Sequence, residues 1–177
     1  MPESSLNEYK NWPKHEIFSK SCIPPETPFF MRLDGCRFKK VSEAINAEKP
    51  FDEKFTKCLV SSGKVLFIKG FNPALIYVAS DELNVLFLDA VPFCGRVEKT
   101  DSVLAGMVSS AFSLNLQKLF NRESVAAFDS RVVIAHTEEK IIEYLSWRQM
   151  NAWRNRNNAY AYWVLSLQNR IKTLRDS

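Results

Sequence analysis

The chain has 177 residues, of which 46% are hydrophobic, 12% aromatic and 25% charged. This length and composition fit one compact domain and exclude a disordered chain, a collagen and a coiled coil. No apolar run approaches the roughly 20 residues of a membrane-spanning helix, and the first residues lack the pattern of a secretory signal, so we expect no membrane association. The net charge of +4 permits an anionic partner without requiring one.

Four cysteines are spread along the chain, at Cys22, Cys36, Cys58 and Cys94. They form no C-x-x-C pair and have no histidine cluster nearby, so their spacing does not favour a structural zinc site. Without an export signal, they are expected to be reduced thiols in a cytoplasmic protein.

The N-terminal part is a lead-in followed by a strand. Residues 1–27 are polar and contain several prolines, so we expect them to wrap around the domain formed by residues 28–177 rather than to pack in it. Residues 29–33 are a short apolar run that stops at Asp34 and Gly35, which predicts a strand that runs into a turn.

Helical and strand patterns then alternate. The spacing of apolar residues between 38 and 59 predicts two helices, the second beginning near Pro50 as a first-turn proline. Residues 75–79 and 83–88 have the composition of strands. The three residues between them predict a hairpin.

A long helix dominates the second half of the chain. After a loop over residues 92–95, the helix is expected from about Val97 to Phe120, with a buried stripe that includes Leu114. Residues 131–135 predict a further strand. A last helical region begins near Thr137 and reaches the C-terminus.

The element order is therefore β-α-β-β-α-β with an added C-terminal helix. It predicts an α+β fold of the ferredoxin-like kind, an antiparallel sheet with helices on one face. Two unrelated functions commonly use this plan. One is the palm of nucleotide polymerases and nucleotidyl cyclases, and the other is the RNA-recognition module.

Two acidic turns are the strongest candidates for chemistry. In the antiparallel arrangement, Asp34 at the end of the first strand and Asp81 at the hairpin tip lie at the same edge of the sheet. Two carboxylates there suit a pair of Mg²⁺ ions, as phosphoryl transfer uses. Gly35 would let the backbone approach an ion, and Ser80 and Glu82 flank the second carboxylate. The alternative is that both aspartates only shape turns.

Basic residues form two further groups. Those near the acidic turns and at the start of the long helix suit a triphosphate, or else form a solvated surface: Arg32, Lys39, Lys49, Arg96 and Lys99. Residues 146–177 carry a strong basic excess interleaved with aromatic residues, a pattern that suits a phosphate backbone and stacked bases. The alternative is that the aromatics belong to the core, as expected for Tyr160 and Trp163.

In this order, several motifs resemble the tRNA-His guanylyltransferase superfamily, and together they cover residues 29–165. They are R-x-D-G followed by E-K-P, then S-D-E, then F-D-x-R-V-V, then L-S-W-R-Q and a final R-N-x-x-N-x-Y-A-Y-W. The resemblance implies a polymerase-like palm that extends RNA in the 3′-to-5′ direction by two-metal catalysis. A nucleoside triphosphate, ATP or GTP, activates a tRNA 5′-end. The 3′-hydroxyl of an incoming nucleotide then attacks it.

The resemblance also implies roles for individual residues. Asp34, the Gly35 carbonyl and Asp81 match metal ligands, with Glu82 beside them at the catalytic centre. The nucleotide-binding positions are Arg32, Lys39, Lys49, Asp52, Ser80, Arg96 and Lys99. The positions expected at the RNA are Arg148, Gln149, Arg154, Asn155 and Arg156.

Departures from the eukaryotic pattern affect the expected reaction. Trp153 stands where the eukaryotic enzymes have a histidine, and Asn151 stands where they have an aspartate. The ending resembles the archaeal and bacterial branch, so we expect template-dependent repair of tRNA 5′-ends, with guanylate addition to tRNA-His as the alternative. The resemblance implies a homo-oligomer, a dimer or tetramer. It also leads us to expect that the family's usual C-terminal extension is missing.

Two further alternatives remain on the same fold. A nucleotidyl cyclase would carry the same pair of carboxylates, but the W-R-Q segment and the basic C-terminal region favour a polynucleotide. A non-catalytic RNA-binding module would need exposed aromatics on a central strand, and residues 83–88 have no such signature.

Overall fold

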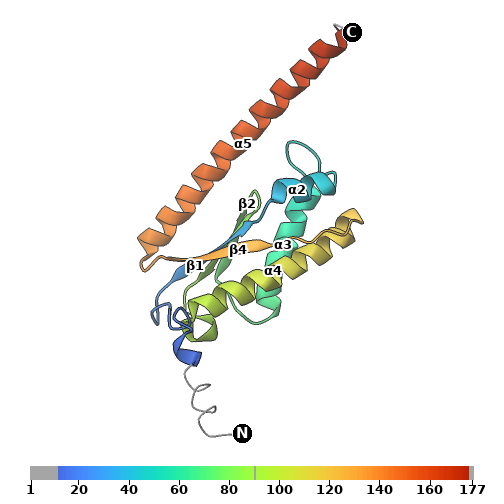
Figure 1. The fold of residues 1–177 in the computed structure, drawn as a ribbon. Helices are drawn as coiled ribbons and strands as arrows, with labels where there is room; N and C mark the ends of the chain where they lie inside the picture. The colour runs from blue at the N-terminus through green and yellow to red at the C-terminus, as the bar shows by residue number, and fades with distance from the viewer. Residues whose placement is uncertain (1–11, 90, 176–177) are drawn as a thin grey trace, which may run out of the picture.

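The computed structural model describes residues 12–89 and 91–175. Helices α3 and α4 cover one face of a four-stranded antiparallel sheet, and the long helix α5 begins against the other face and extends beyond the rest of the molecule (Figure 1). The elements in chain order are η1 (Trp12–Lys14), β1 (Phe29–Gly35), α2 (Phe38–Ala44), α3 (Glu53–Ile68), β2 (Leu75–Ala79), β3 (Glu82–Phe87), η2 (Pro92–Gly95), α4 (Val97–Phe120), β4 (Phe128–Ile134) and α5 (Glu138–Arg175).

The strand order is β2-β3-β1-β4, with every neighbouring pair antiparallel. This confirms the predicted β-α-β-β-α-β arrangement with an additional C-terminal helix. Strands β1 and β3 are central. Their ends therefore bring the first turn and the hairpin together at one edge of the sheet.

Alternation along the central strands builds the main core. Phe29, Met31 and Leu33 of β1 are fully buried and pack in one cluster with side chains of β3, α3 and α4. Alternate residues of a strand point to opposite faces, so these three face the helical layer. Phe30 points the other way and packs against Tyr144 of α5 in a second, smaller cluster.

A phenylalanine cluster joins α2 and α4 to the sheet. Phe112 of α4 is fully buried, and its ring centroid lies 5.0 Å from that of Phe38 and 5.6 Å from that of Phe128. Phe55 of α3 lies 5.5 Å from the same ring. Aromatic pairs at such separations add to the free energy gained by burial alone.

The beginning of α3 differs from the prediction. Asp52 caps the helix by accepting a hydrogen bond from the Phe55 amide, so the helix starts at Glu53 and Pro50 lies in the preceding loop. An aspartate is a strong N-cap, because its carboxylate accepts a hydrogen bond from a first-turn amide that has no partner within the helix.

Three smaller differences lie in the second half. Strand β4 begins at Phe128, three residues earlier than expected, and residues 92–95 form a short 3-10 helix rather than a loop. Helix α4 has the predicted bounds, but Leu114 is 64% exposed. The buried stripe runs instead through Leu104, Val108, Phe112 and Leu116.

The lead-in is described from residue 12, so the prediction for residues 1–11 lies outside the described part. Ile23 is buried in the main core, and its amide donates to the Gly95 carbonyl at 2.8 Å. The amide of Val97 donates to Ser21 at 3.0 Å. This segment therefore holds the start of α4 against the sheet and contributes a core side chain.

Within the described ranges, no helix combines the length and apolar character needed to cross a membrane. All four cysteines are free thiols, with Cys58 buried in the core and the other three exposed.

Phe112→Ala should lower the free energy of unfolding by about 3–5 kcal/mol, because it removes a ring that contacts three other phenylalanines. Leu114→Ala on the same helix should change it by less than about 0.5 kcal/mol, since its side chain is largely in solvent. Denaturant unfolding of both variants measures the difference. Equal losses would contradict the observed orientation of α4.

Candidate functional site

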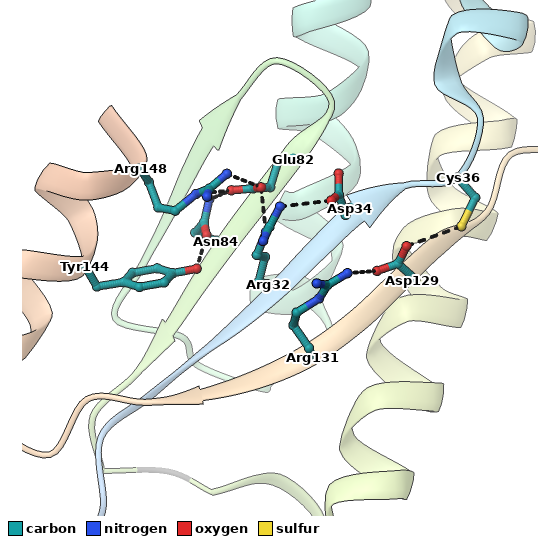
Figure 2. Close-up of polar contacts among 9 residues, drawn as sticks. All are labelled: Arg32, Asp34, Cys36, Glu82, Asn84, Asp129, Arg131, Tyr144 and Arg148. Carbon is teal, nitrogen blue, oxygen red and sulfur yellow. Dashed lines mark hydrogen bonds and ion pairs between the residues drawn. The ribbon is translucent and has the colours of Figure 1, made fainter. Parts of the chain in front are cut away.

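A row of carboxylates crosses the edge of the sheet where β1 ends. Asp34 on β1 lies directly opposite Glu82 on β3 and Asp129 on β4. Residues directly opposite one another share a face of the sheet, and these three lie on the face away from α3 and α4 (Figure 2). We call them the acidic row.

Two further rows lie behind it on the same face. Two residues along each strand, a row of polar and cationic side chains consists of Asn84, Arg32 and Arg131. Two residues farther, an apolar row consists of Leu86, Phe30 and Val133, and it packs against Tyr144 of α5. The face thus changes from acidic through cationic to apolar, and α5 is attached at its apolar side.

The two predicted acidic turns touch through their backbones. The Gly35 amide donates to the Asp81 carbonyl at 3.1 Å. The structure therefore brings Asp34 and Asp81 to the same edge. A Cβ on Gly35 would lie 2.4 Å from the ring of Phe38, so only glycine lets α2 pack this closely against the turn.

The charge of Asp34 is only partly compensated. Burial raises the pKa of its carboxyl group, the nearby Arg32 guanidinium lowers it, and the negative charges of Asp81, Glu82 and Asp129 raise it further, for a net rise. A cation bound at this edge would relieve that repulsion. The donor set of carboxylate oxygens is the one that Mg²⁺ prefers.

Glu82 lies behind this edge in an internal network (Figure 2). Its Oε2 accepts hydrogen bonds from Arg32 Nε at 2.6 Å and from Arg148 Nη2 at 2.5 Å. Its Oε1 accepts from Arg148 Nε at 2.8 Å and from Asn84 Nδ2 at 2.7 Å. Both oxygens are engaged and the residue is buried, an arrangement that suits a structural anion better than an exposed catalytic group.

Arg148 and Tyr144 connect α5 to this network. The Arg148 side chain is 12% exposed and stacks on Trp147, with its guanidinium carbon 4.6 Å from the ring centroid. The Tyr144 hydroxyl donates to Asn84 Oδ1 at 2.6 Å, and burial raises the pKa of this hydroxyl to about 12. The structure thus places Arg148, expected at the RNA, in an ion pair inside the protein.

A pocket of about 330 Å³ lies beside the acidic edge. Its walls come from α2, the loop leading into α3, the first turn of α3 and the β2–β3 hairpin. Five residues predicted to bind nucleotide or metal line it: Lys39, Lys49, Asp52, Ser80 and Asp81.

Asp52 shapes the wall of this pocket. Besides capping α3, its carboxylate accepts a hydrogen bond from the Glu48 amide at 2.8 Å. One buried side chain therefore fixes both ends of the loop that carries Lys49. Phe51, on the same loop and 45% exposed, contacts Tyr160 of α5, with ring centroids 5.6 Å apart.

Arg96 and Lys99 are not brought to this pocket within one chain. They lie at the start of α4, where the backbone bridges to Cys22 near the opposite end of the sheet (Figure 1). Arg96 pairs with Glu98 at 2.5 Å, and Lys99 lies 5.1 Å from the ring centroid of Phe93.

The remaining predicted RNA-binding residues are exposed on α5: Gln149, Arg154, Asn155 and Arg156. Arg154 donates to Asn151 Oδ1 at 3.0 Å, and Arg156 lies 5.7 Å from the ring centroid of Tyr160. Tyr160 was expected in the core, but it is 43% exposed because this part of α5 has passed the end of the sheet. Trp163 is half-buried.

Sequence reasoning missed five residues of the polar network on this face of the sheet. Asp129 and Arg131 lie in the F-D-S-R segment and form an ion pair at 2.9 Å, and Cys36 Sγ donates to Asp129 at 3.6 Å. Asn84 and Tyr144 are buried partners. Asn84 carried a signal, because it is the single polar residue in an otherwise apolar strand core.

Among residues 12–89 and 91–175, no three histidine, cysteine, aspartate or glutamate side chains converge on a point that could hold a metal ion. Asp34 and Asp81 would need further oxygen ligands, such as a backbone carbonyl, water or a phosphate.

Comparison with known proteins assigns the fold to a family. The family model for Thg1, tRNAHis guanylyltransferase, matches residues 9–136. A probable tRNA(His) guanylyltransferase of Drosophila melanogaster is 30% identical over 149 residues, 82% of this chain and 52% of the relative. The enzyme of Saccharomyces cerevisiae is 25% identical over 95% of this chain and 72% of the relative. The chain thus spans about half the length of the fruit fly relative.

Solved structures of the same family name share this fold. A bacterial tRNA(His) guanylyltransferase-like protein in complex with GTP superposes with a TM-score of 0.77 at 22% identity, covering 88% of this chain and 75% of that one. The tRNA(His) guanylyltransferase of Saccharomyces cerevisiae superposes with a TM-score of 0.68 at 27% identity, covering 74% and 60%. The chain therefore belongs to the tRNA-His guanylyltransferase family.

Proposed function

We propose that this chain is a nucleotidyltransferase that adds a nucleotide, preferentially guanylate, to the 5′-end of a tRNA. The observation that carries the proposal is the pocket lined by Asp81, whose turn contacts the turn of Asp34, because it joins two lysines to an acidic edge suited to Mg²⁺. The names of the curated relatives favour guanylate addition to tRNA-His over the templated repair expected from the sequence.

The pocket fits a nucleoside triphosphate. Lys39 and Lys49 supply positive charge for the phosphates, and Phe51 and Phe55 supply aromatic faces for the base. Ser80 lies on the same wall as Asp81 and adds a hydroxyl donor. The bacterial structural relatives were solved in complex with GTP and with ATP, and we propose that this chain uses the same nucleotides.

Asp34 and Asp81 are the residues that would hold the Mg²⁺ ions. Bound Mg²⁺ supplies neutralisation of the charge that develops on the attacking and leaving oxygens. The chain's own contribution is to hold together the two turns that carry these carboxylates, through the Gly35–Asp81 backbone hydrogen bond. Positioning and charge stabilisation account for most catalysis of phosphoryl transfer.

The tRNA would lie along α5. Arg154 and Arg156 are exposed on the part of the helix that passes the pocket, where Tyr160 contacts Phe51. Exposed Trp153 next to them offers a face for stacking. A substrate bound to these side chains would have its end near the pocket.

Templated addition, the repair reaction, is the second candidate. The observation that favours it is the segment of α5 in which Asn151 and Trp153 replace the aspartate and histidine of the eukaryotic pattern.

One assay tests both reactions. A tRNA-His transcript and a tRNA lacking its first 5′ nucleotide are each incubated with Mg²⁺, ATP and one nucleoside triphosphate at a time, with the opposing 3′-strand base varied. Guanylate addition regardless of that base supports the first reaction, and addition dictated by it supports the second. No addition to either tRNA would contradict both.

We also propose that the protein is cytoplasmic, as its free thiols and tRNA substrate favour, and that it forms a dimer or tetramer. Large apolar side chains along α5 remain exposed in one chain, including Tyr162, Val164 and Leu165. Light scattering measures the assembly, and a monomer at micromolar concentration would contradict it.

Asp34→Ala and Asp81→Ala should each reduce nucleotide addition about 1,000-fold or more, because each removes a metal-binding carboxylate. Binding of tRNA should stay within about twofold, since its arginine contacts are intact. Single-turnover assays and filter binding measure the two quantities. Asp89→Ala, at an exposed aspartate away from the acidic row, is the control. Wild-type rates in either site variant would exclude these residues as metal ligands.

Arg154→Met and Arg156→Met should each weaken tRNA binding severalfold at low salt. Each should also make the plot of log association constant for tRNA against log salt concentration less steep by about 0.7–0.9, as the loss of one phosphate contact does. Arg122→Met, at an exposed arginine after α4, is the matched control and should leave both unchanged. Unaltered affinity and slope in the α5 variants would place the RNA elsewhere.

A further inference from the structure

A continuous chain of charged side chains connects α5 to the acidic edge (Figure 2). Arg148 on α5 contacts Glu82 through two hydrogen bonds, of 2.8 and 2.5 Å. Glu82 accepts from Arg32 Nε at 2.6 Å, and Arg32 Nη2 donates to Asp34 Oδ2 at 2.9 Å. Three ion pairs in series thus join α5 to the carboxylate of Asp34.

Exposure is lowest at Glu82 and rises from there toward the edge of the sheet. The Glu82 side chain is 5% exposed, Arg32 18% and Asp34 32%, and Arg148 on the other side of Glu82 is 12% exposed. At the buried end, Arg148 and Arg32 both pair with Glu82. The exposed end is the carboxylate that faces the proposed metal site.

Glu82 orients the side chain of Arg32. Its guanidinium is planar, with donors in a fixed fork, so the hydrogen bond of Nε to Glu82 sets the direction in which Nη2 points. If Arg148 were removed, Glu82 would keep Arg32 as its one cationic partner among these residues. The Arg32 fork would then turn toward the buried Glu82 and withdraw from Asp34.

We propose that Arg148 is a positioning residue: through Glu82 and Arg32 it holds the Asp34 carboxylate in the orientation that binds the metal ion. The proposal rests on the proposed function. It assigns Arg148 to the catalytic edge instead of the RNA, although it lies on the same helix as Arg154. The packing of α5 on the sheet therefore supplies, through Arg148, the contact that orients the metal-binding carboxylate.

The test compares purified Arg148→Met with the wild type in three measurements. These are Mn²⁺ affinity in the presence of GTP, from the electron paramagnetic resonance signal of free Mn²⁺, tRNA-His affinity by filter binding, and kcat against KM for nucleotide addition. We expect Mn²⁺ affinity and kcat to fall about 10- to 100-fold, the range for residues that orient metal ligands, with tRNA affinity and its KM within about twofold. Arg148→Lys, which restores the charge and a single donor nitrogen, should recover part of the loss.

Two further variants separate positioning from attachment of α5. Tyr144→Phe removes another hydrogen bond between α5 and the sheet, and should lower the melting temperature with Mn²⁺ affinity reduced less than threefold. The Glu82→Gln/Arg148→Met double variant removes both buried charges, so it decides the test if Arg148→Met does not fold. Its Mn²⁺ affinity should also fall at least tenfold.

Mn²⁺ affinity and kcat at wild-type values in a folded variant would overturn the proposal. So would a loss of tRNA affinity equal to that of Arg154→Met, or a wild type that binds no Mn²⁺. Failure of the proposed function is visible separately, as a wild type that binds Mn²⁺ and GTP but adds no nucleotide to any tRNA.

Discussion

The buried carboxylate of Glu82 is the constraint around which this face of the sheet is organised. A charge removed from water must be paired and hydrogen-bonded, and Glu82 meets this requirement with two arginines and an asparagine. One arginine comes from β1 and the other from α5, 66 residues away along the chain. The need to pair the Glu82 carboxylate thus attaches the C-terminal helix to the central strands and fixes the position of α5 along them.

The three rows of side chains explain how one sheet face serves two purposes. Antiparallel pairing places Asp34 and Asp129 at the edge that remains open, and Leu86 and Phe30 at the side that α5 covers. Hydrophobic burial then stabilises the helix at one side without covering Asp34 and Asp129 at the other, while Glu82 is buried beneath Arg148. The cationic row between them separates the two environments and supplies the guanidinium that partly neutralises the open edge.

Elements with strong periodicity could be predicted from the sequence, whereas tertiary contacts could not. Helix α4 has the predicted bounds because its apolar spacing is long and regular. The sequence predicts a β4 that begins three residues too late, because β4 is an edge strand whose first residues include the polar Asp129. The motifs located the acidic turns, but the partners of Arg148 depend on a pairing between distant segments. Its charge therefore indicated RNA, although tertiary packing places it against Glu82.

The most direct test of this account is a crystal structure of the protein with GTP and Mg²⁺. The account predicts metal ions on Asp34 and Asp81, the triphosphate beside Lys39 and Lys49, and the Arg148–Glu82 ion pair unchanged from its present geometry. A triphosphate bound to Arg96 and Lys99 of the same chain, at the other end of the sheet and with no ion at the acidic edge, would contradict it.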